Sequence, residues 1–552
     1  MLRVNSVKYP NKMALKDKFS SLTFEQLNQR VNKLSHLLLD IGFQKGDRIS
    51  CFLENCIEIV ELYLACAKTG IIINPINFRL SASEVTYIIN NADSKALFFH
   101  SEFSPLIESI RDSLPQIKHY FIINSVPMSR LGGNIGRSVS QHRSAPNIDV
   151  NVPESIRKTY DDYETSLEKQ SIDEPTCQIK PEDIWVLLYT SGTTGKPKGV
   201  LRSHESYIAF YLINAGDFKF SHHDICLNVM PLCHVNSTFF SFTITYLGGG
   251  VYIIPARHFD PAEILQIIER EKITFISLIP THYHLILNVP ARPGDRSGGS
   301  EEIRKKYDVS SIKKLLCSSA PARGDIKKRI MEYFNGVELY EGYGSTEAGI
   351  VTVLKPEEQL TKVGSIGRES SGTDYIKLLD SNRQEVAIDA VGELYSRGPM
   401  LFNGYYKLSE KTKASFCGEW FSAGDLAKKD KDGYYYLVDR KDNMIISGGE
   451  HIYPSEVEEV LMRHPKVFEA AVIGIPDDKW GEKVTAVIIL KENTSLPDGR
   501  QARLFEDEII DFCRDKISSY KKPKLVKFIL PNEMPRTASG KIRHHELRKL
   551  FC

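Results

Sequence analysis

A loop that combines glycine, hydroxyl and lysine residues is the part of this sequence best suited to chemistry. Residues 188–200 read Leu-Tyr-Thr-Ser-Gly-Thr-Thr-Gly-Lys-Pro-Lys-Gly-Val, directly after the apolar residues Trp-Val-Leu at 185–187. Such a loop can turn several backbone N–H groups toward an anion, and its hydroxyl and ammonium groups add further donors. The alternative is a surface turn, but the apolar strand in front of the loop argues against it. We therefore predict a loop that binds a polyphosphate.

The spacing inside this loop differs from that of the common P-loop. That motif requires four residues between its first glycine and a Gly-Lys pair followed by Ser or Thr. Here Thr193 and Thr194 alone separate Gly192 from Gly195, and a proline follows Lys196. The sequence therefore predicts a phosphate site of another class.

Further motifs follow the loop in a fixed order along the chain. They read Tyr-Gly-Ser-Thr-Glu at 343–347, Phe-Ser-Ala-Gly-Asp at 421–425, Asp-Arg-Lys-Asp at 439–442 with Ser-Gly-Gly-Glu at 447–450, and Pro-Arg-Thr-Ala-Ser-Gly-Lys at 535–541. Together with the loop, they resemble the signatures of the adenylate-forming superfamily, which contains acyl-CoA synthetases, firefly-type luciferases and peptide-synthetase adenylation domains. The resemblance spans residues 188–541, and the N-terminal part is compatible with it.

The resemblance implies a set of contacts to ATP. The phosphates would be held by the loop residues Thr190, Ser191, Gly192, Thr193, Thr194, Gly195 and Lys196, with Lys198 adding charge. Thr346 would donate a hydrogen bond to the α-phosphate. Glu347 would hold Mg²⁺, a hard cation that prefers carboxylate and phosphate oxygens.

The same resemblance implies a nucleoside pocket. Tyr343 would stack on adenine, and the other wall would be formed by Ser319, Ala320 and Pro321. Asp425 would accept hydrogen bonds from the ribose hydroxyls, and Arg440 would reach the ribose or the phosphate. Taken alone, Asp425 and Arg440 would more often form a surface ion pair, so these roles depend on the resemblance.

The C-terminal motifs resemble those of a domain that serves two half-reactions. The lysine that matches Lys541 bridges the carboxylate and the α-phosphate in the family, and a preorganised cation of this kind contributes on the order of 10²-fold in rate. Asp442 matches the hinge about which the domain rotates before the thiol attacks. Gly448 and Gly449 would bring the backbone close to the pantetheine of coenzyme A, a role suited to residues without Cβ.

A histidine motif borders the expected acid pocket. His234, within Pro-Leu-Cys-His-Val-Asn-Ser at 231–237, matches a family position beside the acyl group, and we group it with Lys541, Thr346 and Glu347 as catalytic residues. Asn236 departs from the commonest fatty-acid pattern, which has small or apolar residues here. Betaine-type, aryl and hydroxylated acids therefore stay open. Val235 replaces the aspartate that usually binds the amino group in amino-acid-activating relatives.

Composition excludes several classes of partner and places the protein in the cytoplasm. Lys and Arg number 71 against 70 Asp and Glu, so no basic field predicts nucleic-acid binding. The 10 cysteines form no metal-ligand spacing and suggest reduced thiols. The start of the chain lacks the apolar core of a signal peptide. Charged residues interrupt the apolar stretch 57–73, so it predicts no membrane span. A homodimer is compatible with the sequence.

The alternation of apolar patterns predicts an α/β fold in two domains. The N-terminal domain, 1–440, should contain helices over parallel-rich sheets, and a hinge should join it to a small α+β C-terminal domain, 441–552. We expect helices at 24–39, 57–68 and 504–517, a helix after a capping box at 81–84, and one through 457–461; strands at 47–53, 96–99, 470–475, 484–490 and 526–530; a hairpin of 426–430 with 434–438; and irregular surface segments at 125–182 and 291–305.

The favoured function is an acyl-CoA synthetase. A carboxylic acid and ATP would give an acyl-adenylate and pyrophosphate, and coenzyme A would then give the thioester and AMP. One alternative is a ligase that loads a free acyl-carrier protein. Another is a catalytically inactive binding homologue, against which the intact motif residues argue.

Overall fold

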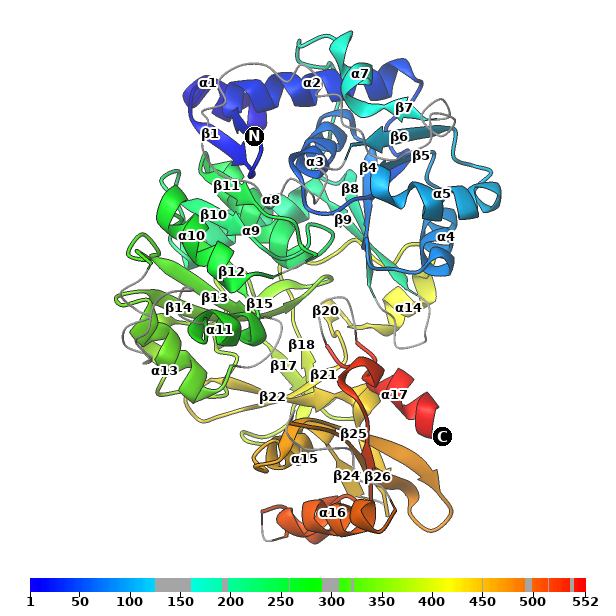
Figure 1. The fold of residues 1–552 in the computed structure, drawn as a ribbon, viewed down its shortest axis with the longest axis vertical. Helices are drawn as coiled ribbons and strands as arrows, with labels where there is room; N and C mark the ends of the chain where they lie inside the picture. Colours follow the sequence, from blue (N-terminus) through cyan, green and yellow to red (C-terminus); the bar gives the residue numbers. More distant parts are fainter. Residues whose placement is uncertain are drawn as a thin grey trace.

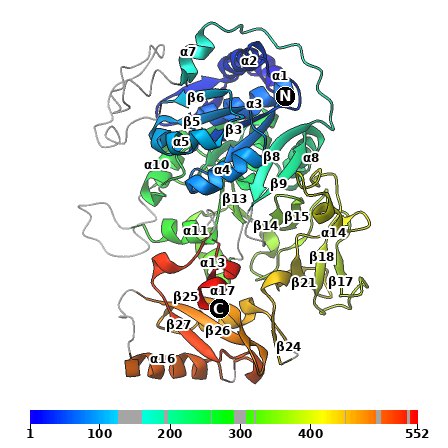
Figure 2. The same ribbon diagram turned by 90° about the vertical axis from the view of Figure 1, so that its right-hand side faces the viewer.

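The computed structural model describes residues 1–124, 160–190, 197–257, 259–289, 307–318, 322–448, 450–491, 499–514, 516–536 and 541–552. Two large sheets with their helices occupy the upper part of the molecule, and a smaller sheet made by the last hundred residues lies below them (Figures 1 and 2). The short helix α1 (Leu2–Lys8) opens the chain.

The first sheet contains seven strands within the described residues, in the order β7-β6-β5-β3-β4-β8-β9. Its strands are β3 (Arg48–Phe52), β4 (Ile72–Ile76), β5 (Ala96–His100), β6 (His119–Ile123), β7 (Asp161–Asp162), β8 (Ile184–Thr190) and β9 (Lys198–Ser203). All neighbours are parallel except β8 and β9. Helices α2 (Phe24–Asp40) and α3 (Ile57–Thr69) cover one face, and α4 (Ala82–Asn91) and α5 (Ser104–Ile110) cover the other. Coverage of both faces explains why the central strands β3, β4 and β5 are almost entirely buried.

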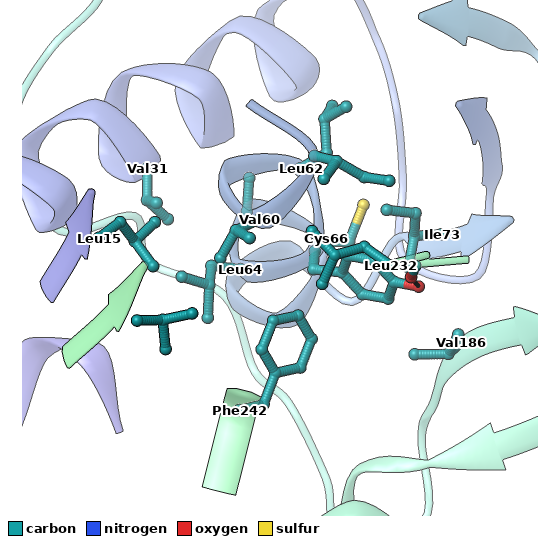
Figure 3. Packing of buried hydrophobic residues seen from close by; sticks show 14 of the residues in the cluster. Leu15, Val31, Val60, Leu62, Leu64, Cys66, Ile73, Val186, Leu232 and Phe242 are labelled. Atoms are coloured by element: carbon teal, nitrogen blue, oxygen red, sulfur yellow. Dashed lines mark hydrogen bonds between the residues drawn. The ribbon is translucent and has the colours of Figure 1, made fainter. Parts of the chain in front are cut away.

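Helix α3 is the centre of the largest core cluster. Figure 3 shows its residues Val60, Leu62 and Leu64 packed among side chains from neighbouring elements. The acidic Glu61 is fully buried in this helix, and its carboxylate accepts hydrogen bonds from Arg30 and from Tyr163 Oη at 2.8 Å. Charge compensation therefore allows a helix that is apolar on most sides to carry acids inside the protein.

The second sheet contains nine strands within the described residues, in the order β16-β15-β14-β13-β12-β10-β11-β1-β2. Its strands are β1 (Met13–Lys16), β2 (Ser21–Thr23), β10 (Ile225–Asn228), β11 (Gly250–Ile253), β12 (Phe275–Leu278), β13 (Lys314–Ser318), β14 (Glu338–Ser345), β15 (Gly349–Leu354) and β16 (Arg368–Glu369). Strands β14 to β1 are parallel neighbours. Helices α8 (His204–Asp217) and α9 (Val235–Leu247) belong to the core cluster on one face, and α10 (Pro261–Glu271), α11 (Pro280–Leu287) and α13 (Gly324–Tyr333) to the cluster on the other.

Smaller antiparallel sheets lead toward the C-terminal part. Strands β17 (Lys377–Leu379), β18 (Gly392–Tyr395), β21 (Asp425–Lys429) and β22 (Tyr435–Arg440) form one sheet, and β19 (Phe416–Cys417) pairs with β20 (Trp420–Phe421) after α14 (Ser409–Ala414). The predicted hairpin is confirmed as β21 and β22. Its turn contains Gly433 at φ 87°, a conformation that a glycine adopts without strain.

Within its described residues, the C-terminal part contains a five-stranded sheet with helices. It comprises β23 (Ile445–Ser447), β24 (Glu450–Ile452), β25 (Val467–Asp477), β26 (Gly481–Leu490) and β27 (Leu525–Phe528), with α15 (Pro454–Leu461), α16 (Gly499–Phe512) and α17 (His544–Phe551). The predicted helix at 504–517 begins and ends about five residues earlier, as α16. The predicted α/β fold with a smaller α+β C-terminal domain is confirmed.

One detail of the predicted layout is confirmed, and another is wrong in part. The capping box at 81–84 is confirmed, because the Ser81 N–H donates to Glu84 Oε2 at 2.9 Å. The expectation of an irregular segment at 125–182 was wrong for residues 161–168, where Asp161–Asp162 pairs with β6 and helix α7 (Tyr163–Glu168) follows. The reason is that Tyr163 and Leu167 are buried in the main core. The expectation is confirmed for residues 169–182, which contain no helix or strand. Segment 291–305 lies outside the described residues.

Within the described ranges, no helix is both long enough and apolar enough to cross a membrane.

Candidate active site

The ends of an antiparallel pair of strands hold the predicted phosphate loop. Thr190 closes β8 and lies opposite Lys198, the first residue of β9. Thr190 Oγ1 is buried and has no hydrogen-bond partner among the described residues, so a hydroxyl is available at the loop entrance. The other predicted loop contacts, Ser191, Gly192, Thr193, Thr194, Gly195 and Lys196, lie outside the described residues, as do Ser319, Ala320, Pro321 and Gly449.

The turn between β14 and β15 carries Thr346 and Glu347. A Cβ on Gly344 would lie 2.0 Å from the carbonyl oxygen of Gly349, so only glycine fits this close approach. Glu347 is buried, and its Oε1 accepts a hydrogen bond from Tyr405 Oη at 2.8 Å. Lys198 Nζ lies 3.9 Å from the same oxygen. Burial lowers the pKa of Lys198, and Glu347 opposes that shift. The Glu347 carboxylate therefore faces Lys198, at the start of strand β9.

A buried arginine that the sequence analysis did not single out donates a hydrogen bond to the backbone of this turn. Arg202, on β9, is fully buried and donates from Nη1 to the carbonyl of Thr346 at 2.7 Å and from Nη2 to the carbonyl of Met400 at 2.6 Å. Its guanidinium lies 5.0 Å from the ring centre of Phe239 and 5.4 Å from that of Tyr207. The available signal was its place directly after the apolar residues Val200 and Leu201 in β9.

Tyr343, Asp425 and Arg440 form one cluster. Tyr343 Oη donates to Asp425 Oδ2 at 2.6 Å, and Arg440 Nε lies 2.7 Å from Asp425 Oδ1. Burial, followed by the charge of Asp425, raises the pKa of Tyr343 well above its ordinary value. Burial alone would lower the pKa of Arg440, but Asp425 reverses this and leaves it raised. Strand pairing accounts for the geometry, because Asp425 and Arg440 lie opposite each other on β21 and β22.

Lys541 interacts electrostatically with this cluster, although it is about 100 residues from Arg440 in the sequence. Loss of hydration within the surrounding protein lowers the pKa of Lys541, and the charge of Arg440 lowers it further; Asp425 opposes the shift. Figure 1 shows helix α17, which follows Lys541, at the junction between the C-terminal sheet and the N-terminal part. The charges of Arg440 and Asp425 therefore act on Lys541, which comes from the C-terminal part of the chain.

His234 interacts electrostatically with Lys541. It precedes α9, and its Nε2 is buried without a hydrogen-bond partner among the described residues. Burial, Arg79 and then Lys541 lower the pKa of His234 to about 4, so the imidazole is neutral near pH 7. Two residues on, Asn236 Nδ2 donates to Ser318 Oγ at 2.5 Å.

The predicted hinge lies between the two parts of the chain. Asp442 belongs to a short 3₁₀ turn, Lys441–Asn443, between β22 and β23. Gly448 has φ +63°, its N–H donates to the carbonyl of Trp480 at 2.7 Å, and a Cβ there would lie 3.1 Å from the Trp480 ring. Trp480 is a neighbour that the sequence analysis missed.

The fit of Mg²⁺ can be judged from its candidate ligand. Across the described ranges, no group of three or more His, Cys, Asp or Glu side chains is arranged to hold a metal ion. A single buried carboxylate, Glu347, suits Mg²⁺, which commonly takes one or two carboxylates together with the phosphates of its nucleotide. The residues present fit such a shared site.

Comparison with known families agrees with this arrangement. The chain belongs to the AMP-binding enzyme family, whose pattern matches residues 2–406, and the AMP-binding enzyme C-terminal domain matches residues 456–541. It is 31% identical to a feruloyl-CoA synthase of Amycolatopsis sp. over 98% of this chain and 96% of that protein. It is also 31% identical to a long-chain-fatty-acid–CoA ligase of Bacillus subtilis (strain 168) over 99% and 93%.

Solved structures share the whole fold. An anthranilate CoA ligase in complex with anthranoyl-AMP is 28% identical and superposes with a TM-score of 0.81 over 100% of this chain and 96% of that chain. The o-succinylbenzoate CoA synthetase of Bacillus subtilis, in complex with its acyl-adenylate, is 26% identical, with a TM-score of 0.79 over 99% and 97%. These relatives are CoA ligases for different acids, so they support acid activation and CoA transfer without specifying the acid.

Proposed function

We propose that this protein is an AMP-forming acyl-CoA synthetase. In the first half-reaction, a carboxylate oxygen of the acid attacks the α-phosphorus of ATP, the bond to the β-phosphate oxygen breaks, and pyrophosphate leaves. In the second, the sulfur of coenzyme A attacks the acyl carbon, the bond to AMP breaks, and the thiol proton is lost to solvent. The observation that carries this proposal is the cluster of Tyr343, Asp425 and Arg440, whose charges also act on Lys541.

The described residues include candidates for most of the contacts that the first half-reaction requires. Tyr343 and Asp425 would hold the nucleoside, with Arg440 beside the ribose. Thr346 would donate to the α-phosphate, Thr190 and the loop after it would take the departing phosphates, and Lys541 would neutralise the charge that gathers as the two anions meet. Mg²⁺, held by Glu347, would supply electrostatic shielding of the phosphates.

The second half-reaction would use another placement of the C-terminal domain. We place the domain boundary at 440/441, where β22 ends, and the pivot at Asp442 in the following turn. The electrostatic interaction of Lys541 with Arg440 and Asp425 supports a placement suited to adenylation. Gly448, and Gly449 after it, would face the pantetheine arm of coenzyme A in the other placement. His234 would border the acyl group.

The test separates the two half-reactions. Once an acid panel has identified a substrate by AMP release, Lys541→Ala should lower ATP–pyrophosphate exchange by about 10²-fold or more and leave thioester formation from the supplied acyl-adenylate largely intact. Lys549→Ala, an exposed lysine on α17, is the matched control and should retain both activities. Equal loss of both half-reactions in Lys541→Ala would contradict the assigned role.

A further inference from the structure

Strand β22 and helix α15 are joined across the predicted hinge (Figure 1). Asp439, on β22, accepts a hydrogen bond at its Oδ2 from the backbone N–H of Ser455 at 2.9 Å, and Ser455 Oγ donates to the carbonyl of Val438. Val438 and Asp439 precede the predicted pivot, Asp442, whereas Ser455 follows it. These bonds therefore connect the N-terminal domain to the C-terminal domain in the present placement.

Asp439 supplies a cap that helix α15 does not provide for itself. The N-cap residue of this helix, Tyr453, makes no side-chain hydrogen bond to the first turn, and the next residue, Pro454, has no N–H. The N–H of Ser455 is therefore the first backbone donor of the helix that needs an acceptor. An aspartate is among the best acceptors for such a donor, and its charge suits the positive end of the helix. The cap of α15 thus comes from the other side of the hinge.

Asp439 is itself held in position by the hinge turn. Its Oδ1 accepts hydrogen bonds from the backbone N–H of Arg440 at 2.6 Å and from Asn443 Nδ2 at 3.2 Å. Both oxygens of the carboxylate are therefore engaged, one by the hinge turn and the other by α15. Because the side chain is already fixed on one side, it loses little further rotamer freedom when it caps the helix.

Helix α15 also contacts the segment that follows Lys541. Glu458, on α15, has its Oε1 2.7 Å from Nε2 of His544, which is the first residue of α17. Burial alone would lower the pKa of His544, but Glu458 and then Asp439 leave it raised. Helix α15 therefore links the strand in front of the hinge to the segment that carries the predicted catalytic lysine.

We propose that Asp439 is a positioning residue for adenylation: by capping α15, it stabilises the placement of the C-terminal domain in which Lys541 faces the nucleotide, and it releases the helix before coenzyme A reacts. The inference rests on the proposed function, because it takes both half-reactions and rotation about Asp442 as given. Since the bonded groups lie on opposite sides of that pivot, rotation would separate them. Asp439 acts through α15 and not by contact with ATP.

Loss of the cap should change the ratio of the two half-reactions. Removal of an aspartate cap changes an equilibrium constant by about 3- to 10-fold. The rate of adenylation follows the population of one placement and the rate of transfer to coenzyme A follows that of the other, so their ratio follows the equilibrium between the placements whichever predominates. A variant that folds less well lowers both rates together and leaves their ratio unchanged.

The experiment measures both rates on one preparation, with an acid identified by AMP release. Adenylation is followed as pyrophosphate release in a single turnover, and transfer as acyl-CoA formed from the supplied acyl-adenylate. Asp439→Ala should lower the ratio of adenylation to transfer by about 3- to 10-fold. Asp439→Asn keeps one carbonyl acceptor and should recover part of the ratio. Ser455→Ala removes the hydrogen bond to the Val438 carbonyl and should lower the ratio by about 2- to 10-fold.

Asp260→Ala is the matched control, because Asp260 caps helix α10 from within the N-terminal domain. Its Oδ1 accepts from the N–H groups of Ala262 and Glu263 at 2.9 and 3.3 Å. This variant also loses a helix cap, so its stability should fall, but its ratio should stay within about 2-fold of wild type. An unchanged or raised ratio in Asp439→Ala, or an equal fall in Asp260→Ala, would overturn the inference while leaving the ligase intact. Absence of pyrophosphate release from the wild type with every acid of a wide panel would instead contradict the proposed function, and with it the premise of the inference.

Discussion

Replacement of Arg202 by methionine should destabilise the protein and slow adenylation together. Methionine has a similar reach, but it cannot donate to the carbonyls of Thr346 and Met400, which now receive hydrogen bonds of 2.7 and 2.6 Å. Both carbonyls would be left facing an apolar side chain in a place from which water is excluded.

The magnitude follows from opposing contributions. Burial lowers the pKa of Arg202 from 12.5 to about 10, which corresponds to a cost of about 3 kcal/mol for keeping the guanidinium charged. Against this, two hydrogen bonds from a charged donor contribute about 1.5–3 kcal/mol each, and stacking on Phe239 and Tyr207 adds about 1–2 kcal/mol. Arg202→Met removes the cost but leaves two unsatisfied carbonyls, so we expect a net loss of about 2–4 kcal/mol.

Thermal unfolding and ATP–pyrophosphate exchange on the same preparation measure the two effects. Because a displacement of about 1 Å in a reacting group can cost about 10²-fold, exchange should fall by about 10-fold or more as Thr346 loses its support. Arg202→Lys, which keeps the charge but not the forked geometry, should be intermediate. Arg323→Met, at a side chain 72% exposed, is the control and should change stability by less than about 0.5 kcal/mol. Wild-type unfolding and exchange in Arg202→Met would refute the reasoning.

Three further predictions concern the metal, the hinge and the pH dependence. Glu347→Gln should depress adenylation sharply because it removes the proposed Mg²⁺ ligand, and added Mg²⁺ should restore part of the rate; wild-type exchange at limiting Mg²⁺ would place the metal elsewhere. Proline fixes φ near about −65°, so Asp442→Pro should trap one placement of the C-terminal domain: adenylate should form while acyl-CoA does not, and undiminished acyl-CoA turnover would argue against rotation. Protonated Lys541 is the proposed active form, and its pKa is lowered. Adenylation should therefore be lost as the pH rises, and the loss should occur at a pH below about 10.4, the ordinary pKa of lysine. Arg440→Gln removes a neighbouring cation and should move that alkaline limb to higher pH, while an unchanged or lower limb would mean that another group titrates.

The main elements of the fold were predictable because their signals are local. The helix at α2 and the strand at β5 follow from apolar spacing within a few residues, and the hairpin around Gly433 from a two-residue turn signal. The segment around Tyr163 was misjudged as irregular because a short helix carries little periodicity. Its burial depends on a partner, Glu61, about 100 residues earlier in the chain.

The candidate site was likewise predictable from the sequence only in part. Tyr343, Asp425, Arg440 and Lys541 could be named from their motifs, and their roles stay predictions; the structure adds that the first three lie together and that two of them act electrostatically on Lys541. The hydroxyl of Tyr405, which donates to Glu347, could not be found from the sequence. It belongs to no motif, and a single tyrosine is more often a core residue than a partner of an active-site acid.

The sequence by itself determined the family and the class of chemistry, since each motif is a short contiguous segment whose residue types already state what it can bind. Tertiary structure alone decided which side chains support those motifs. Arg202 reaches Thr346 and Met400 only because β9 runs behind the turn that follows β14. Asp439 caps α15 only because the chain after β22 folds that helix back onto the end of the strand. Burial and hydrogen-bond satisfaction depend on neighbours distant in the chain, and no local pattern of residues encodes them.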